Sequence, residues 1–134
     1  MEYIKNRKNG VYMRILSEQQ IENLAKALHE RYIQAQKKRE TPSILPDEWD
    51  RLPETIKELN RAQVREFPML IEKYGTSNTE ALARGVHECW MQNCNDKSDP
   101  RMVTYDELPE MEKEKDRTIV RSILQMLKMT GTGV

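Results

Sequence analysis

The sequence predicts a mainly α-helical protein built from two related helix–loop–helix repeats, with four main helices in all. The first observation behind this prediction is a repeated segment. "WDRLPETIKELNR" from Trp49 and "YDELPEMEKEKDR" from Tyr105 open stretches that align without a gap as far as Gly75 and Gly131. Ten of those 27 positions are identical. The second observation is that apolar residues recur at helical spacing in both stretches. Self-similarity of this kind indicates that each copy is one structural unit.

A second pair of matching blocks lies upstream of the first. "LAKALHERYIQ" begins at Leu24 and "LARGVHECWMQ" begins at Leu82, which places Tyr32 opposite Trp90. Between the blocks the second copy is two residues shorter, as is typical of a surface loop. We therefore expect both repeats to pack together as one compact domain. The expected boundaries are 1–16 for an N-terminal arm or hairpin, 17–75 for the first repeat, 76–131 for the second and 132–134 for a flexible tail.

The first helix of each repeat has a predicted start and a predicted buried face. Ser17 with Gln20 forms a capping-box pattern, and Ser77 with Glu80 repeats it. Such a pair satisfies the backbone N–H groups of the first helical turn. The apolar residues at helical spacing are Ile21, Leu24 and Leu28 in the first copy, and Leu82, Val86 and Cys89 in the second.

The second helix of each repeat should begin at a proline. Pro53 and Pro109 suit a first turn because that position needs no N–H donor, and Gly75 and Gly131 are expected as C-caps. Pro68 should kink the helix of the first repeat because it removes one backbone hydrogen bond. The expected inner positions are Ile56, Leu59, Val64, Phe67, Leu70 and Ile71 in the first copy, and Ile119, Val120, Ile123, Leu124 and Leu127 in the second.

The loops and the N-terminus suggest a little β-structure. The loops at 37–48 and 95–104 carry prolines followed by short β-prone stretches, so short strands are expected there. An Asn-Gly pair at 9–10 separates two β-tolerant segments. This arrangement predicts a hairpin or a basic arm between Tyr3 and Ile15.

Composition excludes several classes of protein. The chain has 22 basic and 22 acidic residues, so no overall field attracts it to nucleic acid or to anionic lipid. No apolar run approaches the roughly 20 residues that span a bilayer, and no secretion signal is evident. The two cysteines, Cys89 and Cys94, are too sparse for a disulfide framework. We expect a soluble, cytoplasmic protein with reduced thiols and no membrane partner.

The sequence also offers little to an enzyme or to a cofactor. It lacks a glycine-rich phosphate loop, a nucleophile elbow and an HExxH motif. His87, Cys89 and Cys94 suggest zinc only weakly, because positions 87 and 89 face different ways on a helix and no fourth ligand is evident. We therefore expect no enzymatic activity, no metal and no cofactor. The basic cluster "QAQKKRE" lacks interleaved aromatic residues, so we do not expect a nucleic-acid partner.

The motifs of both copies resemble those of a known family. Each copy reads His-Glu-x-aromatic, then a loop, then (Tyr/Trp)-Asp-x-Leu-Pro-Glu-x-x-Lys-Glu-x-(Asn/Asp)-Arg. This pattern resembles the ryanodine receptor repeat, or RyR domain, which occurs in tandem in the large animal calcium-release channels and also in bacterial and phage proteins. The resemblance covers roughly residues 17 to 131. It implies helical pairs related by a pseudo-two-fold axis, with short strands from the loops.

The resemblance also implies a ligand site. In channel members, one such tandem holds an adenine nucleotide between its repeats through the paired His-x-x-aromatic motifs. Prokaryotic RyR domains are proposed to sense nucleotide-derived signals in antiviral systems. Tyr32 departs from the tryptophan of the family, which keeps a stacking face but adds a hydroxyl. Carried over to this chain, the ligand-binding positions are His29, Tyr32, Asn60, Arg61, His87, Trp90, Asp116 and Arg117.

The residues themselves give a reason why two copies would make a site. Residues three apart share a helix face, so His29 projects with Tyr32 and His87 projects with Trp90. A pseudo-dyad can then present two aromatic walls to one flat ring, with arginines for a phosphate. The structural alternative is that the aromatic residues belong to the core or its rim and that the histidines bond to loop carbonyls. The functional alternative is a protein-interaction or assembly module with no small-molecule ligand.

Overall fold

Four helices make up most of the chain in the computed structural model, which describes residues 3–5, 12–14, 16–38 and 45–129. This confirms the mainly helical prediction. The tail at 132–134 and the C-cap expected at Gly131 lie outside the described residues. The helices are α1 (Glu18–Lys38), α2 (Glu54–Tyr74), α3 (Thr79–Asn93) and α4 (Glu110–Met129).

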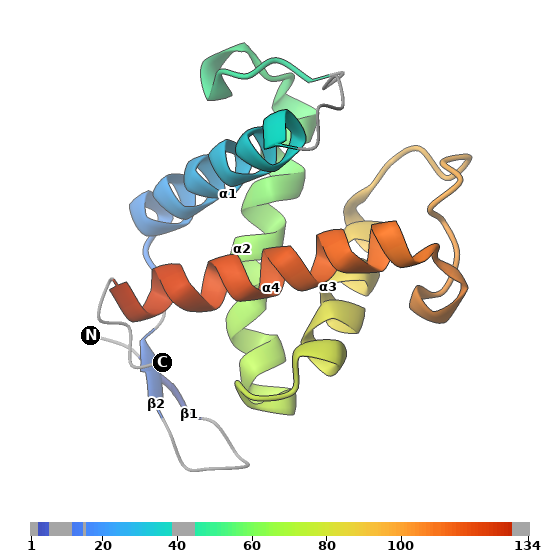
Figure 1. Cartoon of the computed structure of the whole chain (residues 1–134). Coiled ribbons are helices and arrows are strands. Elements are labelled where there is room, and N and C mark those ends of the chain that lie inside the picture. Colours follow the sequence, from blue (N-terminus) through green and yellow to red (C-terminus); the bar gives the residue numbers. More distant parts are fainter. Residues whose placement is uncertain (1–2, 6–11, 15, 39–44, 130–134) are drawn as a thin grey trace.

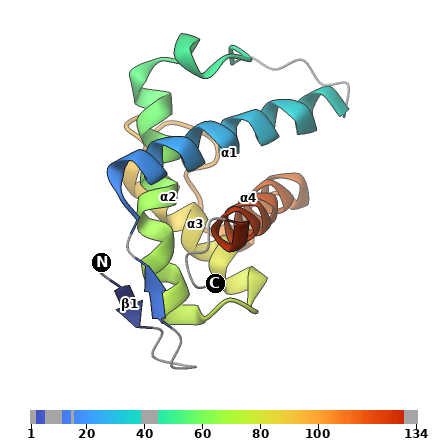
Figure 2. The same cartoon turned by 90° about the vertical axis from the view of Figure 1, so that its left-hand side faces the viewer.

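The helices of each predicted repeat pack against each other, and the two pairs then pack together. α1 contacts α2, and α3 contacts α4. The pairs are joined chiefly through α2 against α3, with further contacts between α1 and α4. Figures 1 and 2, seen from directions at right angles, both show α1 crossing α2 steeply. All four helices therefore meet around one interior.

That interior is filled by the apolar stripes that the spacing predicts. Phe67, Leu82, Ile123, Leu127, Val64, Val86 and Val120 are among the most deeply buried side chains. They come from α2, α3 and α4, and Leu24, Ala25 and Leu28 of α1 complete the cluster. Burial of such side chains contributes about 1.5–3 kcal/mol each relative to exposure. The continuous cluster explains why the two repeats form one body.

The start of α1 is as predicted, whereas the start of α3 is not. Ser17 and Gln20 form the reciprocal pair, with Ser17 N to Gln20 Oε1 at 2.8 Å and Gln20 N to Ser17 Oγ at 3.1 Å. α3 is capped instead by Asn78, whose side-chain oxygen accepts from the N–H of Ala81 at 3.1 Å. The prediction of a Ser77–Glu80 capping box is therefore wrong, because the Glu80 carboxylate is held by Arg117 and Tyr105.

Prolines stand directly before α2 and α4. The carbonyls of Pro53 and Pro109 each accept from the backbone N–H groups three and four residues on, at 3.0 and 3.1 Å. α2 continues through Pro68 as far as Tyr74. It is closed by Gly75, which has a φ of 79° and donates its N–H to the carbonyl of Ile71 at 2.8 Å. The glycine C-cap of α2 is therefore confirmed.

The described parts of the loops between the helices differ from the prediction, while residues 39–44 of the first loop, with most of its β-prone stretch, lie outside the described residues. The described segments at 45–53 and 94–109 contain no strand. Each holds a short 3-10 helix, η1 at Trp49–Arg51 and η2 at Tyr105–Glu107. One reason is that Asp96 and Asp99 each accept from a backbone N–H two residues on, which favours turns over extended pairing.

Two short strands occur near the N-terminus. β1 (Tyr3–Lys5) pairs antiparallel with β2 (Tyr12–Arg14), and Tyr3 lies opposite Arg14. The Asn-Gly turn expected at 9–10 lies outside the described residues.

Candidate functional site between the two repeats

A cavity of about 350 Å³ lies between the two repeats and is lined by side chains of all four helices. Tyr32 of α1 and Trp90 of α3 both line it. Ile56 and Leu59 of α2 and Ile119 of α4, which the spacing predicted as inner positions, border the cavity and are only partly buried. The inner face of each of these helices therefore packs in the core along part of its length and lines the cavity along the rest.

Each aromatic wall is paired with a histidine one helical turn away. The rings of His29 and Tyr32 are stacked with centroids 6.2 Å apart and planes at 24°. His87 and Trp90 repeat this arrangement at 5.8 Å and 18°. All four residues line the cavity. The predicted convergence of the two His-x-x-aromatic motifs on one space is thus present.

Both histidines also hold their own loops in place. His29 and His87 are almost fully buried. Nε2 of His29 lies 3.0 Å from the carbonyl oxygen of Pro46, and Nε2 of His87 lies 2.7 Å from that of Val103. Because a carbonyl only accepts, Nε2 must carry the proton in both rings. The structural alternative for the histidines is therefore correct as well: each ring bonds a loop carbonyl and borders the cavity.

The second predicted pair in the site is Asn60 and Asp116, at equivalent positions of α2 and α4. Both line the cavity. Asn60 donates from Nδ2 to the carbonyl of Ile56 at 3.4 Å. The Asp116 side chain is 14% exposed, and its Oδ2 lies 3.9 Å from Nδ1 of His87. Burial, followed by the negative charge of Glu112, raises the pKa of Asp116 to about 7.

Arg101 is a cavity residue that the sequence analysis missed. Its guanidinium lies over the Trp90 ring, 4.6 Å from the centroid. Asp99 fixes it through two hydrogen bonds, from Nε at 3.0 Å and from Nη2 at 2.7 Å. These bonds lower the pKa of Asp99 to about 2. No motif marked Arg101, because it lies in the loop between the two repeated blocks.

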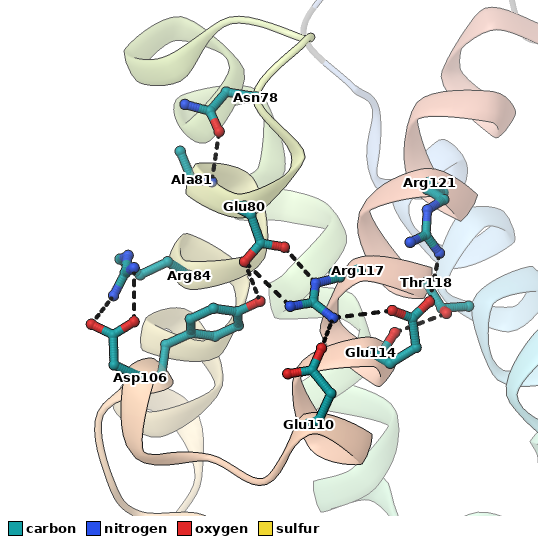
Figure 3. Close-up of polar contacts among 11 residues, drawn as sticks. Asn78, Glu80, Ala81, Arg84, Asp106, Glu110, Glu114, Arg117, Thr118 and Arg121 are labelled. Atoms are coloured by element: carbon teal, nitrogen blue, oxygen red, sulfur yellow. Dashed lines mark hydrogen bonds and ion pairs between the residues drawn. The ribbon is translucent and has the colours of Figure 1, made fainter.

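Arg117 does not line the cavity, contrary to prediction. It donates to the Glu80 carboxylate of α3 and, at 2.5 and 3.2 Å, to Glu110 and Glu114 of α4. Figure 3 shows its guanidinium enclosed by these three carboxylates. The arginine is thus saturated by protein acceptors, and its prediction as a ligand-binding residue is wrong for this cavity.

Arg61 of the first repeat has the same role as Arg117. It donates to Glu22 of α1 at 2.6 Å and to Glu54 at 2.5 Å, and Glu58 lies 3.6 Å away. It too is absent from the cavity lining. An arginine fork suits carboxylates as well as phosphate, so the residue type alone did not reveal which of the two it would bind.

The sequence analysis named Glu80 only as a capping residue and did not name Glu22. Glu22 and Glu80 stand at equivalent positions before Leu24 and Leu82. Each carboxylate also accepts from an aromatic side chain of the following 3-10 helix. Trp49 Nε1 donates to Glu22 at 3.2 Å, and Tyr105 Oη donates to Glu80 at 3.1 Å. The glutamate two residues before the repeated Leu-Ala is therefore the sequence signal for this ion-pair network.

Other chemistries have little support in the described part of the chain. Its side chains contain no group of three or more His, Cys, Asp or Glu residues placed to hold a metal ion. Cys89 and Cys94 are free and buried. Burial, followed by a contact with Glu66, raises the pKa of the Cys89 thiol. No helix among the described residues has both the length and the apolar character to cross a membrane.

The fold and the cavity together define a mainly helical protein of two similar halves with one shared interior space. Comparison with protein-family models, with curated proteins and with solved structures gave no match. The RyR resemblance therefore remains a prediction from the motifs.

Proposed function

We propose that this protein is a non-enzymatic binding module that holds a small, flat aromatic ligand, such as a nucleotide-derived signal, between its two repeats. The observation that carries the proposal is that Tyr32 and Trp90, from different repeats, line one cavity. Stacking on an aromatic side chain contributes about 1–3 kcal/mol per base. Two such walls supply affinity that one repeat alone lacks.

The size and lining of the cavity suit a ligand of this kind. Its volume of about 350 Å³ falls at the small end of the roughly 300–1,000 Å³ typical of ligand sites. Apolar side chains such as Leu28, Ile56 and Ile119 make up part of the lining, and Asn60 and Asp116 add polar groups. A largely apolar site with a few polar groups selects a ligand by hydrogen bonding while stacking supplies affinity.

Three basic residues line the cavity in place of the two arginines that the motifs suggested. They are Arg31, Arg101 and Lys115. Each has a protein partner: Arg31 donates to Gln125 at 3.1 Å, Lys115 donates to Glu112 at 3.1 Å, and Arg101 bonds Asp99. A phosphate would bind by joining or replacing these acceptors. The planar part of the ligand is therefore the part that the cavity supports best.

The RyR resemblance adds a biological setting to the proposal. The equivalent contacts of Arg61 and Arg117, and of His29 and His87, support two equivalent helical repeats, which is the arrangement that the resemblance implies. We extend the proposal to a cytoplasmic sensor of a nucleotide-derived signal in phage–bacteria defence, as the resemblance implies.

Isothermal titration with adenosine 5′-monophosphate and cyclic adenosine monophosphate tests the proposal. We expect saturable binding that Trp90→Ala and Tyr32→Ala each weaken by about tenfold or more, the loss of one stacking wall. Tyr74→Ala is the matched control, because Tyr74 is also a partly buried aromatic residue but lies outside the cavity lining. It should leave binding unchanged.

A different result would favour the other class of function. If neither nucleotide binds and Trp90→Ala simply unfolds the chain, the rings serve packing and the small-molecule proposal fails. Circular dichroism of each variant separates these cases. That result would favour a protein-interaction or assembly module with no small-molecule ligand.

A further inference from the structure

The Trp90 wall of the cavity is already in contact with a side chain of the same protein. The Arg101 guanidinium lies over the Trp90 ring, with Cζ 4.6 Å from the ring centroid. Both residues line the cavity. Carbon atoms in contact lie about 3.5–4.0 Å apart, so a flat ring placed between two groups needs roughly 7 Å between them. The present separation leaves no room for a ligand ring between Trp90 and Arg101.

The other ring neighbour of Trp90 leaves no more room. The His87 ring is nearly parallel to that of Trp90, with centroids 5.8 Å apart and planes at 18°. His87 is almost fully buried and bonds the Val103 carbonyl through Nε2, so moving it would break a buried hydrogen bond. The Arg101 side chain, by contrast, is 48% exposed. Of the two groups beside Trp90, Arg101 is therefore the one that can move.

Asp99 holds the Arg101 guanidinium over the ring. Its carboxylate accepts from Nε of Arg101 at 3.0 Å and from Nη2 at 2.7 Å. A two-point bond of this kind fixes the plane of a guanidinium as well as its position. The attraction between the cation and the face of the Trp90 ring adds to it. The contact is therefore a defined arrangement, in which the cation takes the place that a stacked ligand would occupy.

The loop that carries Arg101 does not depend on this contact for its course. Asp99 accepts from the backbone N–H of Arg101 at 2.9 Å. The backbone N–H groups of Met102 and Val103 donate to the carbonyls of Asp99 and Arg101 at 2.9 and 2.8 Å. His87 of α3 holds the Val103 carbonyl. The guanidinium can therefore leave Trp90 toward solvent while the loop stays in place.

We propose that Arg101 is an internal competitor for the ligand: its guanidinium occupies the face of Trp90 in the free protein, and an aromatic ligand stacks there only after displacing it. This inference rests on the proposed function and concerns the regulation of the same site. Asp99 sets the strength of the competition, because it fixes the guanidinium in place. An aromatic ligand must gain more from Trp90 than Arg101 loses, so weakly stacking ligands are rejected.

Isothermal titration with adenosine tests the inference, because a nucleoside carries no phosphate that could itself attract the guanidinium. Arg101→Ala should bind adenosine about fivefold more tightly than the wild type, the equivalent of one arginine–aromatic contact. Asp99→Asn keeps an acceptor for the backbone N–H but loses the charged two-point bond, so it should tighten binding by a smaller factor of about two.

Arg84→Ala is the matched control. Arg84 also lies over an aromatic ring, with Cζ 5.2 Å from the centroid of Tyr105, and Asp106 accepts two hydrogen bonds from it at 3.0 Å. It does not line the cavity. Its removal takes away the same charge and the same kind of contact, yet the affinity for adenosine should stay unchanged. Circular dichroism verifies the fold of each variant before titration.

Nuclear magnetic resonance observes the displacement directly. A proton held over the face of an aromatic ring resonates upfield of its usual position, so the Nε–H of Arg101 should show this shift in the free protein. Arg101→Lys removes the signal and thereby identifies it. Saturating adenosine should return the signal towards the position of an ordinary arginine. A change in the loop alone would leave the guanidinium over Trp90 and the shift in place.

Each result has a distinct meaning. Unchanged or weaker binding of adenosine by Arg101→Ala overturns this inference and leaves the proposed function standing, and so does an Arg101 signal that keeps its shift while adenosine binds. Tighter binding by Arg84→Ala as well would assign the gain to lost charge and would also overturn it. If neither the wild type nor Arg101→Ala binds adenosine or adenosine 5′-monophosphate, the proposed function fails and this inference fails with it.

Discussion

Arg61 of α2 donates two hydrogen bonds to Glu22 of α1, from Nε to Oε2 at 2.6 Å and from Nη2 to Oε1 at 3.2 Å. The pair joins the two helices of the first repeat across 39 residues of sequence. It is also the contact that distinguishes a folding role from a ligand-binding role for the repeated arginine. The second repeat forms the same contact between Arg117 and Glu80.

Arg61→Leu should destabilise the protein by about 1–2 kcal/mol. This cost exceeds that of an ordinary surface pair because the Arg61 side chain is 18% exposed and bridges Glu22 and Glu54. Arg117→Leu should also lower the urea midpoint, because it removes the equivalent pair with Glu80. Arg65→Leu is the matched control, since its pair with Glu58 is exposed, and it should cost about 0.5 kcal/mol or less.

Urea unfolding followed by circular dichroism measures these effects. Affinity for any cavity ligand should be unchanged in the folded Arg61 and Arg117 variants. If either substitution abolished ligand binding while leaving the urea midpoint unaltered, the arginines would belong to the site after all.

Asn78→Ala should destabilise α3 by about 1 kcal/mol, because the N-cap bond to Ala81 would be lost. Ser77→Ala is the control, since Ser77 is exposed and does not cap the helix. It should leave the melting temperature almost unchanged. If Ser77→Ala destabilised the protein more than Asn78→Ala, Ser77 would be the N-cap.

Gly75→Ala should destabilise the protein by about 1–2 kcal/mol. Gly75 has a φ of 79° and a ψ of −166°, a conformation that only glycine adopts readily. A Cβ there would meet no other atom within 4 Å, so the effect is one of backbone strain alone. Differential scanning calorimetry should show this destabilisation as a lower melting temperature. A neutral result would mean that the end of α2 can rearrange.

The stability of the protein should depend on pH through Asp116. Its pKa is about 7 in the folded chain, against 3.8 for an ordinary aspartate. Between these values the unfolded chain has lost the proton and the folded chain retains it, so rising pH destabilises the fold until about pH 7. Asp116→Asn cannot ionise and therefore does not lose stability in this way. Its free energy of unfolding at about pH 8 should exceed that of the wild type by on the order of 1 kcal/mol or more.

Urea titrations at about pH 5 and about pH 8 test this dependence. The advantage of Asp116→Asn should shrink at the lower pH. Asp106→Asn provides the contrast, since Arg84 holds the pKa of Asp106 below its usual range, and it should bring no gain at high pH. An advantage for Asp116→Asn that did not vary with pH would point to packing rather than ionisation.

The sequence was a good guide where one local rule decided the outcome. Helical spacing predicted the buried faces, Ser17 with Gln20 predicted a helix start, and Gly75 predicted a helix end. The repeated motifs also predicted that Tyr32 and Trp90 would line one space. These features depend on spacing within a helix, which can be read from the chain directly.

The sequence did not predict the correct partner where two acceptors competed for one donor. Arg61 and Arg117 fit a phosphate in principle, yet nearby carboxylates from a separate helix bind them. Asn78 and Ser77 are both good caps, and only the tertiary pairing of Glu80 decides between them. Arg101 carried no motif, because its position over Trp90 depends on the course of a loop. In each case the tertiary contacts between elements far apart in the sequence decide which partner is bound.

The unlike ends of the cavity break the symmetry that the duplication would otherwise impose. Trp90 carries Arg101 on its face, and Asp116 of the second repeat stands at the position that the amide of Asn60 occupies in the first. In a perfect dyad, a flat guest would enter equally well in either of two poses. In this cavity the two orientations would place the ligand against different side chains. A ligand whose two edges differ should therefore bind in one orientation, and a crystal structure of the complex should show that orientation alone.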